Sequence, residues 1–177
     1  MNGDAWVEEV LARYKEQKSL ADRAIAQLGD DALFAALDGD GNSVAVIMKH
    51  VGGNLRSRWS DFLTTDGEKP DRKRDSEFET GAADSRAAVT ARWEEGFRTA
   101  LDSLRSLTDA DLARTIVIRG EPHSVVQAIS RNLTHTAQHV GQIVFLAKHL
   151  AGSGWKTLSI PKGKSEEFTK KLRADRI

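Results

Sequence analysis

The chain has 177 residues, of which 40% are hydrophobic and 29% charged, as in ordinary globular domains. Its 26 basic and 26 acidic residues cancel, so no net charge draws it to nucleic acid or to an anionic membrane. With no cysteine, disulfides, thiolate nucleophiles and cysteine-bound metals are excluded, and any metal ion must be held by histidine or oxygen ligands. We expect one domain, residues 1–177, with neither nucleic acid nor a membrane as partner.

No apolar run approaches the 18 or so residues that a membrane-spanning helix needs. The first residues, MNGDAWVEEV, are acidic and amphipathic, whereas a secretory signal is basic and then apolar. Both features predict a cytoplasmic protein.

The first two predicted helices are long and amphipathic. Apolar side chains recur at intervals of three and four residues over residues 6–28, and Gly29 follows as a stop signal. The turn-rich segment DGDGNS comes next, and its Asn42 or Ser43 is expected to cap a second helix that ends near Thr64.

A long polar connection separates the second helix from the third. Residues 65–84 contain Gly and Pro and show no apolar period, which predicts a surface segment. The third helix follows, with one apolar stripe from Val89 to Leu104. A connection of this length allows the two helices to be something other than antiparallel neighbours.

The fourth helix has the clearest start signals. The β-branched run at residues 115–120 is too short for a helix and predicts an extended connector. Pro122 suits a first helical turn, and Ser124 with Gln127 forms a capping-box pattern, so we expect a helix from there to about Leu150. Four such helices predict an all-α protein, a four-helix bundle whose inward side chains can build a metal or ligand site.

His135 and His139 lie one turn apart on the fourth helix and therefore share a face. Their face carries a polar stripe beside an apolar one, which predicts a cavity or groove. His50 sits in an apolar part of the second helix. Imidazoles at this spacing can converge on one Zn²⁺, Ni²⁺ or Fe²⁺ ion, and a third ring would leave positions open for water or substrate. The alternative is a set of hydrogen-bonded or half-exposed histidines, and the pattern alone leaves it open.

Longer stretches resemble the DinB-like (YfiT-like) metal-binding proteins, in particular a branch whose members have no assigned activity. The matching text is NSVAVIMKHVGGNLRSRWSDFLTTDGEKP, AIAQLGDDALF, IRGEPHSVVQAI, HTAQHVGQIVFLAKHL and WKTLSIPKGKSEEF, spread over about residues 15–168. The resemblance implies an up-down-down-up four-helix bundle with its crossover at residues 65–84. It also implies a divalent metal bound by His50, His135 and His139.

Neighbours of these histidines are expected to shape the pocket. Asn54, Arg131 and Gln142 each lie about one turn from a candidate ligand, where they would orient a ring or meet a substrate group. Only Asn54 and Gln142 offer an oxygen acceptor, and the alternative for Arg131 and Gln142 is solvent contact or an ordinary interhelical bond. Gly52 and Gly53 cost about 1 kcal/mol each against Ala in a helix, which predicts close helix packing or open space near the metal.

Some DinB-like proteins look like transferases or isomerases of low-molecular-weight thiols such as bacillithiol or mycothiol. The resemblance therefore implies a metal-dependent thiol S-transferase-like enzyme in stress response or detoxification, with a small-molecule substrate and zinc, nickel, iron or manganese as its metal. The alternatives are a non-enzymatic, stress-linked metal- or ligand-binding protein and a metal-dependent hydrolase. Relatives often look dimeric and the bundle surface would allow a homodimer, but the sequence leaves the oligomeric state open. No carboxylate can be assigned as general base from the sequence.

Overall fold

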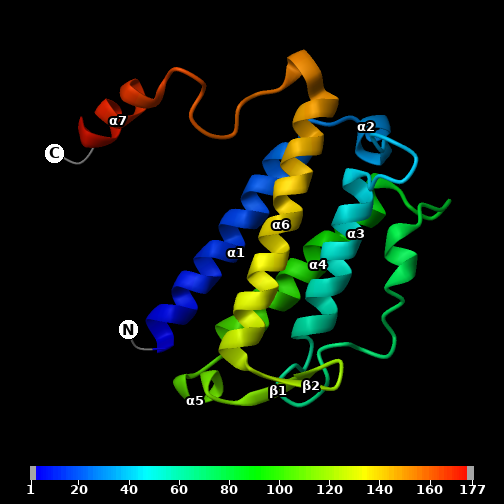
Figure 1. Ribbon diagram of the computed structural model, residues 1–177, viewed down its shortest axis with the longest axis vertical. Coiled ribbons are helices and arrows are strands. Elements are labelled where there is room, and N and C mark those ends of the chain that lie inside the picture. The colour runs from blue at the N-terminus through cyan, green and yellow to red at the C-terminus, as the bar shows by residue number, and fades with distance from the viewer. Residues whose placement is uncertain (1–2, 175–177) are drawn as a thin grey trace.

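The computed structural model describes residues 3–174, which form helices and one short β-hairpin (Figure 1). The all-α prediction is confirmed. The four long helices are α1 (Gly3–Ile25), α3 (Val44–Trp59), α4 (Arg86–Arg105) and α6 (Val125–Ala151). The shorter elements are α2 (Asp30–Phe34), the 3₁₀ helix η1 (Asp75–Phe78), α5 (Asp109–Leu112), β1 (Thr115–Ile118), β2 (Glu121–Ser124), the 3₁₀ helix η2 (Gly152–Gly154) and α7 (Ser165–Ala174).

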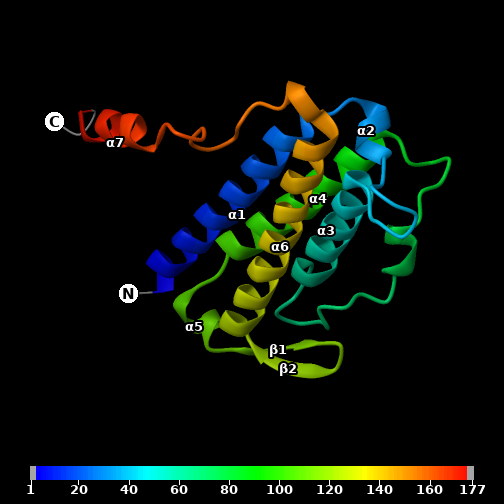
Figure 2. The same cartoon turned by 45° about the horizontal axis from the view of Figure 1, so that its top comes forward.

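The four long helices lie side by side around one hydrophobic core (Figures 1 and 2). Helix α1 packs against α4 and α6, and α3 packs against the same two helices. The largest fully buried side chains come from three of them: Trp59, Trp93, Tyr14, Phe97 and Leu11. Helices α1, α4 and α6 each bury one stripe of their surface, whereas α3 is buried at most of its positions, and the core lies between these helices.

Both predicted helix caps are present. The Ser43 hydroxyl accepts a hydrogen bond from the Val46 backbone N–H at 3.2 Å, which caps α3. At the start of α6, the Ser124 hydroxyl accepts from the Gln127 N–H at 3.1 Å, and the Gln127 side chain accepts from the Ser124 N–H at 2.8 Å. This reciprocal pair is the predicted capping box.

Helix α3 is shorter than predicted and ends at Trp59 instead of near Thr64. The Ser60 hydroxyl donates to the Arg56 carbonyl at 2.8 Å, which satisfies a carbonyl at the end of the helix. Asp61 then has a φ of 45°, in the left-handed region, and a helix cannot continue through that conformation. The apolar pattern extended past this point because the following turn still buries Phe62.

Residues 115–120 are part of a β-hairpin and not only an extended connector. Strand β1 pairs antiparallel with β2, and Val117 lies opposite Pro122, so the placement of Pro122 in the first turn of the fourth helix is wrong. Arg119 and Gly120 at the turn have φ values of 56° and 77°, as a two-residue hairpin turn with matching twist requires. The hairpin crosses one end of the four long helices (Figure 2).

The connection between α3 and α4 is held against the body of the protein. At its far end, the buried Lys49 ammonium donates to Asp84 Oδ2 at 2.7 Å and to the Glu79 carbonyl at 2.6 Å. Near its start, Asp66 accepts backbone N–H groups from Arg119 and Gly120, each at 2.8 Å. The connection therefore reaches both the flank of α3 and the hairpin, and η1 lies on it beside α3 (Figure 1).

The C-terminal segment leaves the end of α6, and α7 stands apart from the long helices (Figures 1 and 2). The Gln27 side chain tethers the start of this segment, since its Oε1 accepts from the Lys156 N–H at 2.7 Å. Within residues 3–174, no helix has both the length and the apolar character that crossing a membrane requires.

Candidate metal centre

Three histidine rings from two helices meet at one point. His50 comes from α3, and His135 and His139 come from successive turns of α6. One ligand nitrogen from each lies within 4.8 Å of the other two, so the three side chains could hold a metal ion. The Nε2 atoms of His50 and His135 are 3.2 Å apart. Two nitrogens bound to tetrahedral zinc at 2.0–2.1 Å would be about 3.3–3.4 Å apart, so this pair already has a suitable spacing.

Two of the rings are oriented by oxygen acceptors. His50 Nδ1 lies 2.9 Å from Glu77 Oε2, and His139 Nδ1 lies 2.8 Å from Gln142 Oε1. Because a carboxylate and an amide oxygen can only accept, each Nδ1 carries the hydrogen and each Nε2 keeps its lone pair. This is the tautomer and the outer hydrogen bond that metal-binding histidines usually have.

Two of the rings, His135 and His139, are held in the uncharged form that a metal ligand needs. Burial lowers the pKa of His135 to about 4, with further lowering from the neighbouring His139 and His50. Burial also lowers the pKa of His139. A direct hydrogen bond between the Nε2 atoms of His50 and His135 would explain those two atoms only. It would leave out the third ring, His139, whose centroid lies 4.9 Å from that of His50 and 4.6 Å from that of His135.

Glu77 is the functional residue that the sequence did not reveal. Its side chain, in η1, is buried and accepts two hydrogen bonds of 2.8 Å from Arg72, one on each carboxylate oxygen. Burial opposes ionisation of this carboxyl, but the hydrogen bonds from His50 and Arg72 outweigh it and hold its pKa below the usual value. An ionised Glu77 makes the His50 ring a stronger ligand, because the hydrogen bond that it accepts from the Nδ1–H group raises the basicity of Nε2.

Gly52 and Gly53 serve the two purposes that were predicted as alternatives. A Cβ at Gly53 would lie 2.2 Å from Glu77 Oε1, so the missing side chain makes room for the carboxylate behind His50. A Cβ at Gly52 would lie 2.6 Å from the Arg92 carbonyl, and one at Gly96 would lie 2.5 Å from the Gly52 carbonyl. These glycines allow the backbones of α3 and α4 to approach closely. Gly53 was the one sequence signal that pointed toward Glu77.

The three predicted neighbours occupy different places. Gln142 contacts a candidate ligand, His139, as described above. Asn54 contacts no histidine, and its Oδ1 accepts a hydrogen bond from Asn132 Nδ2 at 2.8 Å. Arg131 Nη1 lies 3.2 Å from Nε2 of His123, which is not one of the three converging rings. Asn54 and Arg131 instead line the adjoining cavity, and the roles predicted for all three residues stay predictions.

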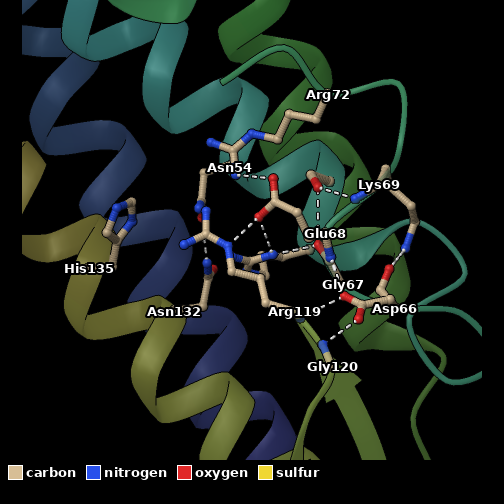
Figure 3. A network of polar contacts seen from close by, with 12 residues as sticks. Asn54, Asp66, Gly67, Glu68, Lys69, Arg72, Arg119, Gly120, Asn132 and His135 are labelled. Atoms are coloured by element: carbon tan, nitrogen blue, oxygen red, sulfur yellow. Dashed lines mark hydrogen bonds and ion pairs between the residues drawn. The ribbon is translucent and has the colours of Figure 1, made fainter. Parts of the chain in front are cut away.

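A cavity of about 170 Å³ opens beside His50 and His135. Figure 3 shows His135 and Asn132 on one side, and Arg72, Arg119 and Glu68 on the side of the connecting segment and the hairpin. The cavity predicted from the polar stripe of the fourth helix is confirmed. The residues that line the cavity are His50, Asn54, Arg58, Arg72, Arg74, Ile118, Arg119, Ala128, Arg131, Asn132 and His135.

Mostly helical architecture and a three-histidine cluster between two helices are what the resemblance to DinB-like (YfiT-like) proteins implies. Over residues 2–164 the chain matches the family described as "Protein of unknown function (DUF1572)". Because this match covers most of the chain, the chain belongs to that family, which is one of DinB/YfiT-like proteins, and the resemblance seen in the sequence is confirmed. No curated protein matches the chain.

Proposed function

We propose that this chain is a metal-dependent enzyme of the thiol S-transferase type, acting on a small-molecule electrophile in stress response or detoxification. One divalent ion of zinc, nickel, iron or manganese would be held by His50, His135 and His139. The observation that supports this is the convergence of three imidazoles beside an open cavity, with the buried Glu77 behind one of them. Three protein ligands leave positions free for substrate, as in catalytic and not structural sites.

We further infer one domain over residues 1–177, a four-helix bundle of up-down-down-up order. The connection between α3 and α4 supports this topology, because it returns along the outside of α3 before α4 begins (Figure 1). Residues 1–2 and 175–177 lie outside the described part of the chain. A cytoplasmic location stays a prediction from the sequence, which leaves a homodimer open.

The chain's own residues would prepare the site for a thiol. Glu77 and Gln142 fix two rings with their Nε2 atoms available, and the burial of His135 and His139 keeps these rings uncharged at neutral pH. A bound divalent ion supplies Lewis acidity, which lowers the pKa of a thiol and increases its thiolate fraction. The thiol proton would leave to water, the sulfur would bond to the electrophilic carbon, and the leaving group would depart with its bonding electron pair.

The direct test is thiol consumption with bacillithiol or mycothiol and a chromogenic electrophile such as 1-chloro-2,4-dinitrobenzene. We expect metal-loaded protein to be at least tenfold faster than metal-depleted protein, and His135→Ala to lose this difference. His149→Ala removes an exposed histidine of the same helix and should match the wild type. Equal rates with and without metal would contradict the proposal. Strong stabilisation by metal without turnover would favour the non-enzymatic alternative.

A further inference from the structure

The charged residues that line the cavity beside the histidines are all basic. Five arginines reach it, and no aspartate or glutamate belongs to its lining. They come from three parts of the chain, namely helix α3, the connection between α3 and α4, and the hairpin with the start of α6. These arginines are Arg58, Arg72, Arg74, Arg119 and Arg131. Topology therefore gathers a set of guanidinium groups that are far apart in the sequence.

The carboxylates that accompany this set lie behind the cavity wall. Glu68 contacts three of the arginines: Arg119 Nε at 2.9 Å, Arg58 Nη1 at 3.1 Å and Arg72 Nη1 at 3.4 Å. Figure 3 shows Glu68 between Arg72 and Arg119. Glu77 is already engaged by Arg72 and His50. Two carboxylates thus make the direct ion pairs of three guanidinium groups.

The outer arginines add to the excess. Arg131 has no carboxylate partner among the described residues, and its Nη1 lies 3.2 Å from Nε2 of His123. Arg74 lies 3.6 Å from Asp75, a surface carboxylate whose side chain is 98% exposed, and solvent weakens such a pair. The positive field reaches the metal-site histidines. After burial and the two neighbouring imidazoles, Arg72 and Arg58 are the next causes of the lowered pKa of His135.

A chain of hydrogen bonds orients the Asn54 side chain so that its amide N–H group can donate into the cavity. Trp59 Nε1 and the Tyr14 hydroxyl both donate to Asn132 Oδ1, at 3.0 and 2.8 Å. A tryptophan N–H can only donate, so the Asn132 amide is fixed with its Nδ2 toward Asn54 Oδ1, at 2.8 Å. The second half of the Asn54 amide, Nδ2, is thereby left as a donor without a partner in the described chain. Asn54 is only 7% exposed and lines the cavity.

We propose that this cavity is an oxyanion site that receives a carboxylate or phosphate group of the substrate, with Arg131 and Asn54 Nδ2 as contacts. A guanidinium and an amide N–H are natural partners for such oxygens, and Asn54 belongs to the residues that line the cavity. The volume of about 170 Å³ suits one small anion or the anionic end of a larger molecule. Binding of the anionic group does not depend on the proposed function. The inference rests on that function only for the identity of the rest of the substrate molecule.

The position of the cavity gives the oxyanion site a role in the reaction. Arg131 and His135 lie one turn apart on the same face of α6, so an anion held by Arg131 is beside His135 and His50, which line the same cavity. Anchoring one end of a substrate there would orient its reactive end toward the metal site, and orientation of this kind is a large part of catalysis. The substrate class is thus an acidic small molecule.

The test is calorimetric titration of succinate and, separately, inorganic phosphate, at constant ionic strength balanced with sodium chloride. It is run on metal-loaded and on metal-depleted protein, so that an anion bound by the metal is recognised. Arg131→Gln and Asn54→Asp remove the two proposed contacts, and the second change keeps the oxygen that accepts from Asn132. Arg105→Gln is the matched control, because it removes an exposed arginine from α4, away from the cavity.

We expect at least one probe to bind with and without metal, about tenfold more weakly in Arg131→Gln and more weakly still in Asn54→Asp. The control should change affinity less than twofold. Preference for succinate would identify a carboxylate group, and preference for phosphate a phosphate group. Absence of binding of both probes, binding only when metal is present, or equal weakening in the control would overturn the proposal. None of these readouts depends on thiol turnover, so the two proposals can fail separately.

Discussion

Nε2 of His50 and Nε2 of His135 lie 3.2 Å apart, although the residues are 85 positions apart in the chain and belong to different helices. Each of the two rings has a further nitrogen, and these differ: that of His50 donates to Glu77, whereas that of His135 is buried without a partner. A shared ion reconciles the close approach of two ring nitrogens with the nearby third ring of His139.

Metal content tests this relationship most directly. We expect about one transition-metal ion per chain in untagged wild-type protein, by elemental analysis. His50→Ala and the double change His135→Ala/His139→Ala should each lose it, because fewer than three imidazoles remain. The exposed His149 supplies the control, since His149→Ala should retain the ion. Wild-type protein that takes up none of Zn²⁺, Ni²⁺, Fe²⁺ or Mn²⁺ would show that the histidines are structural.

Replacing Glu77 with glutamine should weaken metal binding and the fold together. The affinity should fall about 10–100-fold in chelator competition, because His50 loses the ionised acceptor of its N–H. The Arg72 side chain is only 3% exposed, and loss of its main counter-charge should reduce the free energy of unfolding by about 3 kcal/mol. Glu79→Gln removes the same charge from the same connection at an exposed position, and should change neither quantity. Equal effects of the two changes would argue against a specific role for Glu77.

Two glycine-to-alanine substitutions distinguish the steric effect of an added Cβ from its effect on helix propensity. Gly53→Ala places a Cβ 2.2 Å from Glu77 Oε1, so the carboxylate must move; we expect about tenfold weaker metal binding and a net destabilisation of about 1–2 kcal/mol. Gly141→Ala on α6 meets nothing within 4 Å and should stabilise the protein by about 0.5–1 kcal/mol. Chemical unfolding and chelator competition measure both effects. If Gly53→Ala also stabilised the protein and bound metal normally, the space beside Glu77 would be unimportant.

The stability of metal-free protein should depend on pH through His135. Its pKa is about 4 in the fold and about 6.5 in an unfolded chain, so between these values protons bind preferentially to the unfolded state. The stability that neutral His135 contributes is complete above pH 6.5 and is lost as the pH falls toward 4. We expect the wild type to lose about 1–2 kcal/mol more than His135→Gln over this range, less than the full shift implies because the ring is only half-buried.

The measurement for this prediction is urea unfolding at a series of pH values between 4 and 7.5 for both proteins. The difference between the two curves isolates His135 from the carboxylates that titrate in the same range. Parallel curves would contradict the prediction.

Local signals in the sequence predicted helices and their starts well. Ser43 and the pair Ser124 and Gln127 were correct because a cap is a contact between neighbours in the chain. The hairpin was missed because its turn residues, Arg119 and Gly120, are not one of the common Asn-Gly or Asp-Gly pairs. A proline inside β2 then resembled a helix start.

The candidate site was predictable only in part, because local sequence patterns report on residues that are close together in the chain. His135 and His139 share a helix face, His50 stood in an apolar part of the second helix, and the family resemblance joined the three in one site. Glu77 could not be found in this way, because it reaches His50 through a connection without a repeating pattern. Of the five arginines of the cavity wall, Arg131 was named from its distance to His135 along the helix. The other four were invisible, since only the folded path of the chain brings them together.

Gly53 and Glu77 are sterically complementary, since the Glu77 carboxylate occupies the space where a side chain at position 53 of α3 would be. A chimera that takes the segment between α3 and α4 from a relative would therefore keep this arrangement only if residue 53 were exchanged together with the segment. A graft that brought Glu77 next to a larger residue would have the correct histidines and an unsupported His50. Transplanting this centre into another helical scaffold thus requires five positions at the least: three rings, one carboxylate and one place left empty.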